Sequence, residues 1–155
     1  MNVNGKPYRT IWLAEDGRAV EIIDQTRLPH EFITVRLETM TDAATAIADM
    51  WVRGAPLIGA AAAYGMALAM GEDATDGGLG YAYDTLLETR PTAVNLRWAL
   101  DDLKALLEPM DAGARADAAY VRAAEICGED VAICSAIGDH GAALIQDIAA
   151  KRGSG

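Results

Sequence analysis

The sequence predicts an α+β fold in which a small antiparallel β-sheet is followed by a bundle of helices. Residues 8–37 contain three short runs rich in β-branched and aromatic side chains, with a turn signal between the first two. From residue 39 onward, apolar residues recur every three or four positions, as they do in amphipathic helices. Residues 54–71 carry no charged side chain, which indicates a helix buried at the centre of the bundle.

The β-sheet is expected within an N-terminal subdomain of residues 1–38. Tyr8–Ala14 and Ala19–Asp24 read as two strands that flank Glu15-Asp16-Gly17, a hairpin signal. Glu31–Leu37 reads as a third strand. Because three strands alone are marginally stable, we expect the helices to cover one face of this sheet.

The first two helices are expected to meet at a tight corner. Thr39 or Thr41 can cap the first helix, and Asp42 suits its first turn. We expect this helix to end at Gly54, because glycine accepts the left-handed conformation that closes many helices. Pro56 then suits the first turn of the second helix.

The rest of the chain completes a helical subdomain, expected to span residues 39–155. The predicted elements are a loop at 73–80, a helix at 81–89, a helix opened by Pro91 or Thr92, a turn at 110–113 and a helical stretch at 114–150 with a possible break near Gly128. Gly138 and Gly141 indicate close packing of that last stretch against a neighbour. Trp51, Tyr64 and Trp98 are expected in the core.

Composition and charge exclude several classes of function. The 155 residues carry a formal net charge of −10, which disfavours nucleic acid and anionic membranes as partners. The start of the chain lacks the apolar core of a signal peptide. The run at 54–71 is short for a membrane span and contains four glycines, so a buried helix is the better interpretation. We therefore expect a cytoplasmic protein.

The cysteines and histidines form no recognisable site. Cys127 and Cys134 are seven residues apart, which fits no zinc signature and is about two helical turns, too far to bridge. Buried free thiols are the expected state. His30 lies in a predicted turn and His140 on a predicted helix, and neither has a partner that would suggest catalysis. The sequence predicts no metal site and contains no nucleotide fingerprint.

Two arginines stand at the entrances of predicted helices. Arg53 precedes Gly54 and Ala55 at the start of one predicted helix, and Arg90 precedes a proline at the start of another. A helix N-terminus offers unpaired N–H groups and a positive dipole end, so two such entrances would suit a dianionic phosphate. The alternative is that each arginine caps the carboxyl end of the preceding helix.

Several stretches resemble one enzyme family, the S-methyl-5-thioribose-1-phosphate isomerases of methionine salvage. Their superfamily also contains ribose-1,5-bisphosphate isomerase and the regulatory subunits of the exchange factor for translation initiation factor two. The resemblance extends over nearly the whole chain. Its stretches are Arg9–Trp12, Asp24–Pro29, Val52–Gly65, Arg90–Leu96, Glu129–Cys134 and Ile137–Ala142.

The resemblance implies that Arg53, Gly54, Ala55 and Arg90 bind the phosphate of a sugar-phosphate substrate. The family reaction converts 5-methylthioribose 1-phosphate to 5-methylthioribulose 1-phosphate, without a metal or nucleotide cofactor. The family's catalytic Cys and Asp belong to a Rossmann-like domain, and we expect both to lie beyond Gly155. The resemblance thus implies no catalytic residue in this chain, an inactive fragment on its own, and a homodimer for the full-length enzyme.

The alternative function belongs to a different class. It is a non-catalytic regulatory or sugar-phosphate-sensing subunit, like the translation-factor relatives. The close match around Arg53 and Arg90 favours the enzyme.

Overall fold

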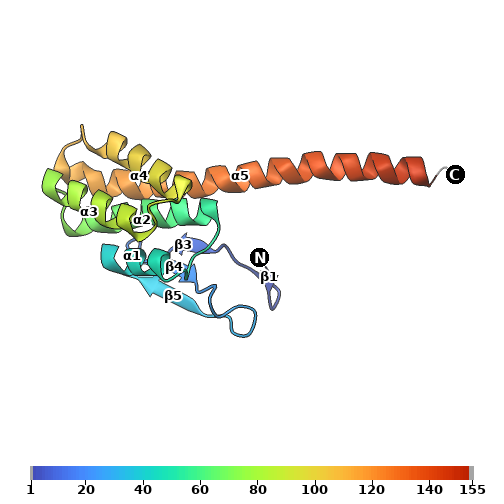
Figure 1. Ribbon diagram of the computed structural model, residues 1–155, viewed down its shortest axis with the longest axis horizontal. Coiled ribbons are helices and arrows are strands. Elements are labelled where there is room, and N and C mark those ends of the chain that lie inside the picture. Colours follow the sequence, from blue (N-terminus) through green and yellow to red (C-terminus); the bar gives the residue numbers. More distant parts are fainter. Residues whose placement is uncertain (1, 154–155) are drawn as a thin grey trace.

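The computed structural model describes residues 2–153 and confirms the α+β class, with short strands followed by helices (Figure 1). Met1, Ser154 and Gly155, at the outer ends of the two expected subdomains, lie outside the described residues. The strands are β1 (Asn2–Val3), β2 (Lys6–Pro7), β3 (Ile11–Leu13), β4 (Val20–Ile23) and β5 (Thr34–Leu37). The helices are α1 (Met40–Ala48), α2 (Ala55–Glu72), α3 (Asp76–Thr89), α4 (Val94–Leu107) and α5 (Ala112–Arg152).

The predicted three-stranded sheet is present, in the order β3-β4-β5 and antiparallel throughout. Ile22 in the central strand pairs with Ile11 on one side and Val35 on the other, and its side chain is fully buried. β5 is shorter than predicted and begins at Thr34, because the chain after Asp24 folds into consecutive turns. The small β1–β2 hairpin was not predicted.

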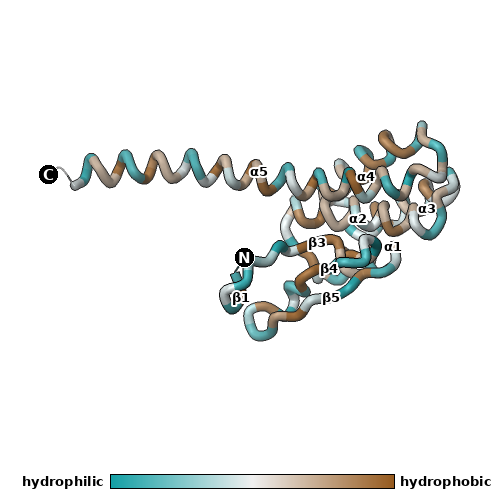
Figure 2. Tube along the Cα trace, turned by 180° about the vertical axis from the view of Figure 1, so that it is seen from behind, coloured by the Kyte–Doolittle hydropathy of each residue, from teal (hydrophilic) through white to brown (hydrophobic). Residues whose placement is uncertain are grey.

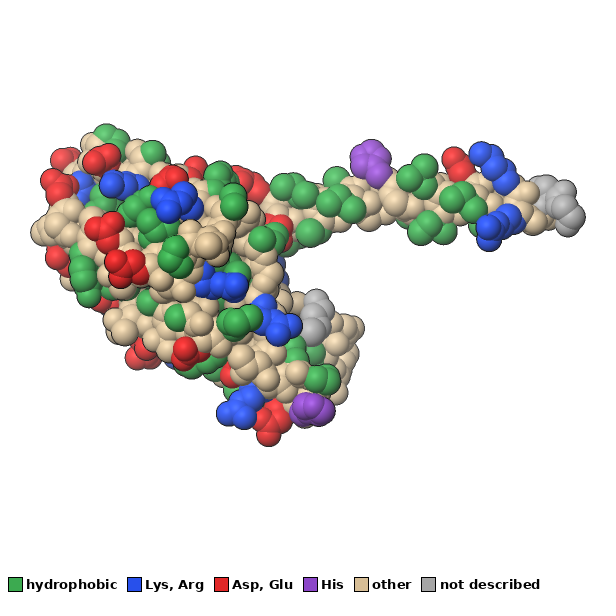
Figure 3. Space-filling model, viewed as in Figure 1, with side chains coloured by type: hydrophobic (Ala, Val, Ile, Leu, Met, Phe, Trp, Pro, Cys, Tyr) green, Lys and Arg blue, Asp and Glu red, His purple; other side chains and the backbone are tan. Residues whose placement is uncertain are grey.

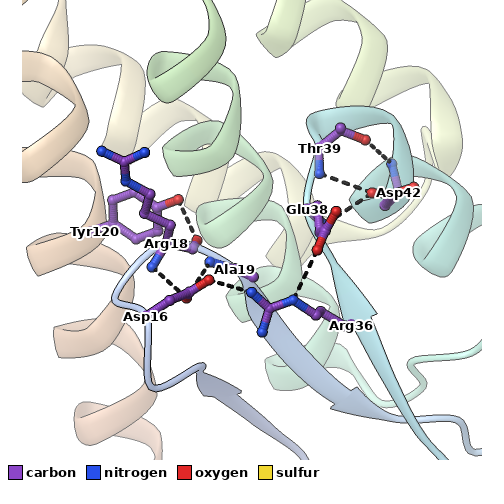
Figure 4. Close-up of polar contacts among 8 residues, drawn as sticks. All are labelled: Asp16, Arg18, Ala19, Arg36, Glu38, Thr39, Asp42 and Tyr120. Atoms are coloured by element: carbon purple, nitrogen blue, oxygen red, sulfur yellow. Dashed lines mark hydrogen bonds and ion pairs between the residues drawn. The ribbon is translucent and has the colours of Figure 1, made fainter.

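The turn of the β3–β4 hairpin is fastened to the last helix. The Asp16 carboxylate accepts hydrogen bonds from the backbone N–H groups of Arg18 (3.0 Å) and Ala19 (3.1 Å), and it also pairs with the Arg36 guanidinium (Figure 4). The Tyr120 hydroxyl, on α5, donates to the Arg18 carbonyl at 2.6 Å. Residues far apart in sequence therefore hold the sheet against the helices.

A capping box opens α1, and Thr39, not Thr41, supplies it. The Thr39 hydroxyl accepts from the Asp42 N–H at 3.1 Å, and the Asp42 carboxylate accepts from the Thr39 N–H at 2.9 Å (Figure 4). The expected end of this helix was wrong, because α1 ends at Ala48 and not at Gly54. Met50 takes the left-handed conformation (φ 61°), which turns the chain out of the helix early.

Helix α2 is the centre of the helical layer, as predicted. Every residue from Ile58 to Met70 is buried, and the helix packs against α1, α3, α4 and α5. Its alanines and glycines allow these four neighbours to approach closely. Among the described residues, no helix is long and apolar enough to cross a membrane.

The predicted loop at 73–80 was wrong, because α3 already begins at Asp76. Thr75 is its N-cap and accepts a hydrogen bond from the Gly78 N–H at 3.1 Å. This cap offsets part of the cost of the glycines in the first turn. The next helix, α4, begins at Val94, two residues after Thr92, and buries the predicted leucine stripe: Leu96, Leu100, Leu103 and Leu107.

Helix α5 runs without a break through Gly128 and projects well beyond the other elements (Figures 1 and 2). The packing expected at Gly138 and Gly141 is wrong in this structure, since a Cβ at either position would have no neighbour within 4 Å in the described part of the chain. Cys127 is half-buried but Cys134 is exposed, so the prediction of buried thiols was wrong for Cys134. Trp98 is also exposed, on the outer face of α4, and does not belong to the core.

Candidate functional site

The four residues singled out from the sequence line one surface hollow. Arg53, Gly54, Ala55 and Arg90 surround a space of about 500 Å³ between the start of α2 and the start of α4. The remaining lining residues come from the same two chain segments and the beginning of the α1–α2 link: Met50, Ile58, Thr92, Ala93, Val94 and Asn95. The hollow is thus built almost entirely from two helix entrances.

The first entrance is shaped by Gly54. This residue is the N-cap of α2 and has φ 97° and ψ 133°, a conformation that favours glycine because a side chain would strain it. Its carbonyl accepts the first helical hydrogen bond, from the Ile58 N–H at 3.0 Å. No side chain caps α2, so the N–H groups of Ala55 and Leu57 are left for solvent or a ligand. Pro56, between them, has no N–H.

The second entrance is a tight turn from Arg90 to Ala93. The Ala93 N–H donates to the Arg90 carbonyl at 2.9 Å, and Ala93 is the N-cap of α4 without a side-chain acceptor. Away from the hollow, α1 and α3 are capped by Thr39 and Thr75, whereas α5 also lacks a side-chain cap. The two helices that open into the hollow therefore keep their first N–H groups unused by side chains.

Arg53 and Arg90 supply the positive charge of the hollow. Arg53 is exposed and Arg90 is half-buried. Within residues 2–153, no carboxylate forms an ion pair with either guanidinium. Capping of the preceding helix does not explain Arg53, because α1 ends five residues earlier. In a chain with a net charge of −10, two unpaired cations at two helix N-termini form a local anion-attracting site.

The lining of the hollow carries positive charge but no general acid or base. It contains no carboxylate, histidine, cysteine or lysine that could act as an acid, a base or a nucleophile. Nor do the described residues bring together three or more His, Cys, Asp or Glu side chains in a way that could hold a metal ion. The expected roles of Arg53, Gly54, Ala55 and Arg90 in phosphate binding remain predictions.

Sequence reasoning did not single out Thr92 or Asn95, although both lie in the 90–96 stretch that carries the resemblance. It also missed a second hollow of about 260 Å³, whose lining includes Arg9, Pro56, Cys127 and Asp130. Burial raises the pKa of the Cys127 thiol. These residues are distant in sequence and meet only because α5 packs along α2, so no local pattern connects them.

The chain is similar to proteins of known name. It is 66% identical over 145 residues to the methylthioribose-1-phosphate isomerase of Paramagnetospirillum magneticum. The matched region covers 94% of this chain but only 40% of that protein. The crystal structure of 5-methylthioribose 1-phosphate isomerase from Pyrococcus horikoshii OT3 superimposes with a TM-score of 0.74 at 38% identity, covering 81% of this chain and 37% of that one. The chain thus spans about 40% of the length of the isomerases that it matches.

A translation factor is also a structural neighbour. The translation initiation factor eIF-2B subunit delta of A. fulgidus gives a TM-score of 0.72 at 33% identity, covering 81% of this chain and 38% of that protein. The model of the Initiation factor 2 subunit family matches residues 51–150, which hold α2 and both sides of the hollow. From this match and these similarities, we conclude that the chain belongs to the Initiation factor 2 subunit family.

Proposed function

We propose that this chain is the phosphate-binding part of an aldose–ketose isomerase that converts 5-methylthioribose 1-phosphate to 5-methylthioribulose 1-phosphate in methionine salvage. The main observation in support is the hollow, which combines Arg53 and Arg90 with two helix N-termini that lack side-chain caps. The similarity to proteins named as this isomerase supports the choice of substrate. The reaction would take place in the cytoplasm, and a full-length enzyme would be a homodimer.

In this proposal the hollow binds the phosphate and holds the sugar in place. The anomeric oxygen of the substrate carries the phosphate, so the phosphate must stay bound while hydrogen moves between C2 and C1. Arg53 and Arg90 would donate charge-assisted hydrogen bonds, and the N–H group of Ala55 at the start of α2 would add a preorganised dipole. The groups that move hydrogen would belong to the part of the relatives that this chain does not match.

The proposed division of labour follows the two layers of the fold. In this proposal, residues 1–38 would be a β-subdomain, and residues 39–155 would be a helical subdomain that carries the phosphate hollow. The helical subdomain would position the substrate for a second, Rossmann-like domain. By itself, the 155-residue chain would bind the sugar phosphate without turning it over.

A regulatory or sugar-phosphate-sensing subunit is the second candidate, because the eIF-2B subunit delta is a structural neighbour at 33% identity. The isomerase is favoured, because the relative of that name reaches 66% identity. Both candidates bind a sugar phosphate, so binding alone does not separate them. An activity test on a complete catalytic unit does.

The test is a chimera in which this chain replaces the matching segment of the Paramagnetospirillum isomerase. We expect it to isomerise 5-methylthioribose 1-phosphate. In this chimera, Arg53→Ala or Arg90→Ala should lower kcat/KM by about 30- to 1,000-fold, equivalent to ~2–4 kcal/mol. Arg53→Lys should recover only part of the loss, since an ammonium group cannot form two parallel hydrogen bonds. The matched control is Arg27→Ala, which removes an exposed arginine outside the hollow and should leave kcat/KM unchanged.

Binding and melting of the unmodified 155-residue chain complete the test. Calorimetric titration should show that the chain binds 5-methylthioribose 1-phosphate and that Arg53→Ala weakens this binding. Arg53→Ala should change the free energy of unfolding by no more than ~1 kcal/mol. Normal kinetics with a large drop in melting temperature would mean that Arg53 has a structural role only. A folded chimera that binds the substrate but never converts it would favour the regulatory candidate.

A further inference from the structure

Gly59 of α2 faces the α4 backbone at Asn95, and its neighbour Ile58 lines the hollow. A Cβ atom on residue 59 would stand 2.9 Å from the carbonyl oxygen of Asn95, 3.5 Å from its carbonyl carbon and 3.6 Å from its Cβ. Real Cβ atoms essentially never come within 3.0 Å of another heavy atom. The obstructing atom belongs to the backbone, so a side chain at 59 would be accommodated only if one helix moved.

Asn95 ties this contact to the hollow. It is the second residue of α4 and is itself part of the lining, five residues after Arg90. On the facing helix, Gly59 lies one turn after Ala55, whose N–H opens into the same hollow. The contact between 59 and 95 therefore sets the separation of the two helix entrances that carry the arginines.

The other end of α4 is firmly anchored. Leu100, Leu103 and Leu107 are fully buried, and the Arg115 guanidinium donates to the Leu107 carbonyl at 3.0 Å. Leu96, in the first turn of α4, is also fully buried, so a displacement forced at Asn95 would be concentrated in Val94, Asn95 and the less buried turn from Arg90 to Ala93. Most of these residues line the hollow.

Gly65 provides an internal comparison on the same helix. It is also buried and crowded, but a Cβ there would meet side chains only: Leu86 at 3.0 and 3.1 Å and Ala43 at 3.2 Å. A leucine side chain can change its rotamer, whereas the Ala43 methyl is fixed to the backbone of α1, so the adjustment would fall on Leu86 and α1 and not on α4. Gly65 is also about 9 Å further along α2, away from the hollow.

We propose that Gly59 is a positioning residue of the anion hollow. Its lack of a side chain lets the first turn of α4 dock against α2, and this holds Arg90 and Arg53 at the separation that one phosphate group can bridge. This inference rests on the proposed function of the hollow and adds a determinant of its geometry. Shifts of about 1 Å in such arrangements can cost two orders of magnitude in function.

The test compares Gly59→Ala with Gly65→Ala in the 155-residue chain. Both substitutions add the same methyl group to the same helix, so the gain in helix propensity is matched. Calorimetric titration with inorganic phosphate and with 5-methylthioribose 1-phosphate should show binding weakened at least about tenfold in Gly59→Ala and within about twofold of the original chain in Gly65→Ala. Thermal melts by circular dichroism on the same preparations report the packing cost of each.

Amide chemical shifts provide a readout that does not depend on binding. Gly59→Ala should shift the resonances of residues 90–96, whereas Gly65→Ala should shift those near Leu86 and Ala43. If Gly59→Ala is unfolded at the assay temperature, both variants are compared in trimethylamine N-oxide, which favours the folded state.

Two results would overturn the inference. One is a folded Gly59→Ala chain that binds phosphate as the original chain does. The other is an equal loss of binding in both variants, which would make Gly59 a packing residue like Gly65. If the original chain binds neither ligand, the proposed function fails. The spacing role is then decided by the amide shifts, where movement at 90–96 supports it and none refutes it.

Discussion

The two halves of α5 have the same sequence pattern and opposite surroundings. In the first half, Ala119, Ala123 and Ile126 form a stripe at three- and four-residue spacing that is buried against the domain. The stripe continues at the same spacing in the projecting half, through residues that include Ile133, Ile137, Leu144 and Ile148. Ile126 is 5% exposed, whereas Ile137 is 66% exposed.

Figure 3 shows hydrophobic side chains along the projecting helix, where no other element of the chain covers them. Periodicity therefore identifies which residues share a face of a helix but not whether another element covers that face. The two halves differ in burial because the rest of the domain packs against only the first. Three predictions test this difference in burial.

The largest effect is expected at Arg115, in the packed half. Its side chain is almost fully buried and donates to the carbonyls of Leu107 (3.0 Å), Glu108 (3.2 Å) and Ala74 (2.8 Å), and to the Asp76 carboxylate (2.6 Å). It thus joins α5 to the end of α4 and the start of α3. The Asp76 side chain is 90% exposed, so most of the stabilisation comes from the carbonyl contacts.

Arg115→Met should lower the free energy of unfolding by ~3–5 kcal/mol, because it removes the guanidinium donor from three carbonyl groups, of which Leu107 keeps the Met110 N–H, and retains only the apolar stem. Urea denaturation followed by circular dichroism measures the change. Arg122→Met is the control on the same helix. Its ion pairs with Asp102, Glu125 and Glu129 are solvent-accessible, so we expect a loss of ~1 kcal/mol or less. Equal losses in the two variants would contradict the prediction.

The second prediction compares the two halves of the stripe directly. Ile126→Ala should cost ~2–3 kcal/mol, since it removes buried methyl groups and leaves a cavity. Ile137→Ala should change stability by no more than ~0.5 kcal/mol, because most of the side chain is already in solvent and alanine favours helix. Urea denaturation of the two variants, side by side, measures the two changes in the free energy of unfolding. A substantial loss at 137 would show that the projecting stripe is covered in solution.

The smallest effect concerns the two thiols. Burial raises the pKa of Cys127, so at pH 8 less of it is the reactive thiolate, and its reaction with a disulfide reagent should accelerate as the pH rises. Single-thiol chains, Cys134→Ser and Cys127→Ser, separate the two rates. We expect the exposed Cys134 to react about tenfold faster at pH 8. In urea the difference should vanish, and a difference that persisted would point to a local effect of sequence.

Local patterns were sufficient for much of the fold. The hairpin signal at 15–17, the uncharged run of α2 and the leucine stripe of α4 all describe one element and its nearest neighbours. The pattern failed where local alternatives compete. Met50 ended α1 early through a left-handed backbone that few non-glycine residues adopt, and Thr75 capped a glycine-rich segment that resembled a loop.

The candidate site was partly predictable for the same reason. Arg53 and Arg90 each stand at a helix entrance, which is a local property, so both could be picked out from the sequence. That they line one hollow depends on how α2 and α4 cross, and the determinant of that crossing is the contact between Gly59 and the Asn95 backbone. A glycine within an alanine-rich helix gives no sign of which atom it faces.

The projecting helix also determines how the molecule moves in solution. The whole helix, with 41 residues, is about 60 Å long. A compact chain of this length has a radius of gyration of about 15 Å, which corresponds to a diameter of roughly 40 Å. The particle is therefore a small body with a long rod, and it will tumble more slowly about its short axes than its 16.4 kDa mass suggests. On a gel-filtration column calibrated with compact proteins, a monomer of this shape elutes early and imitates a larger species.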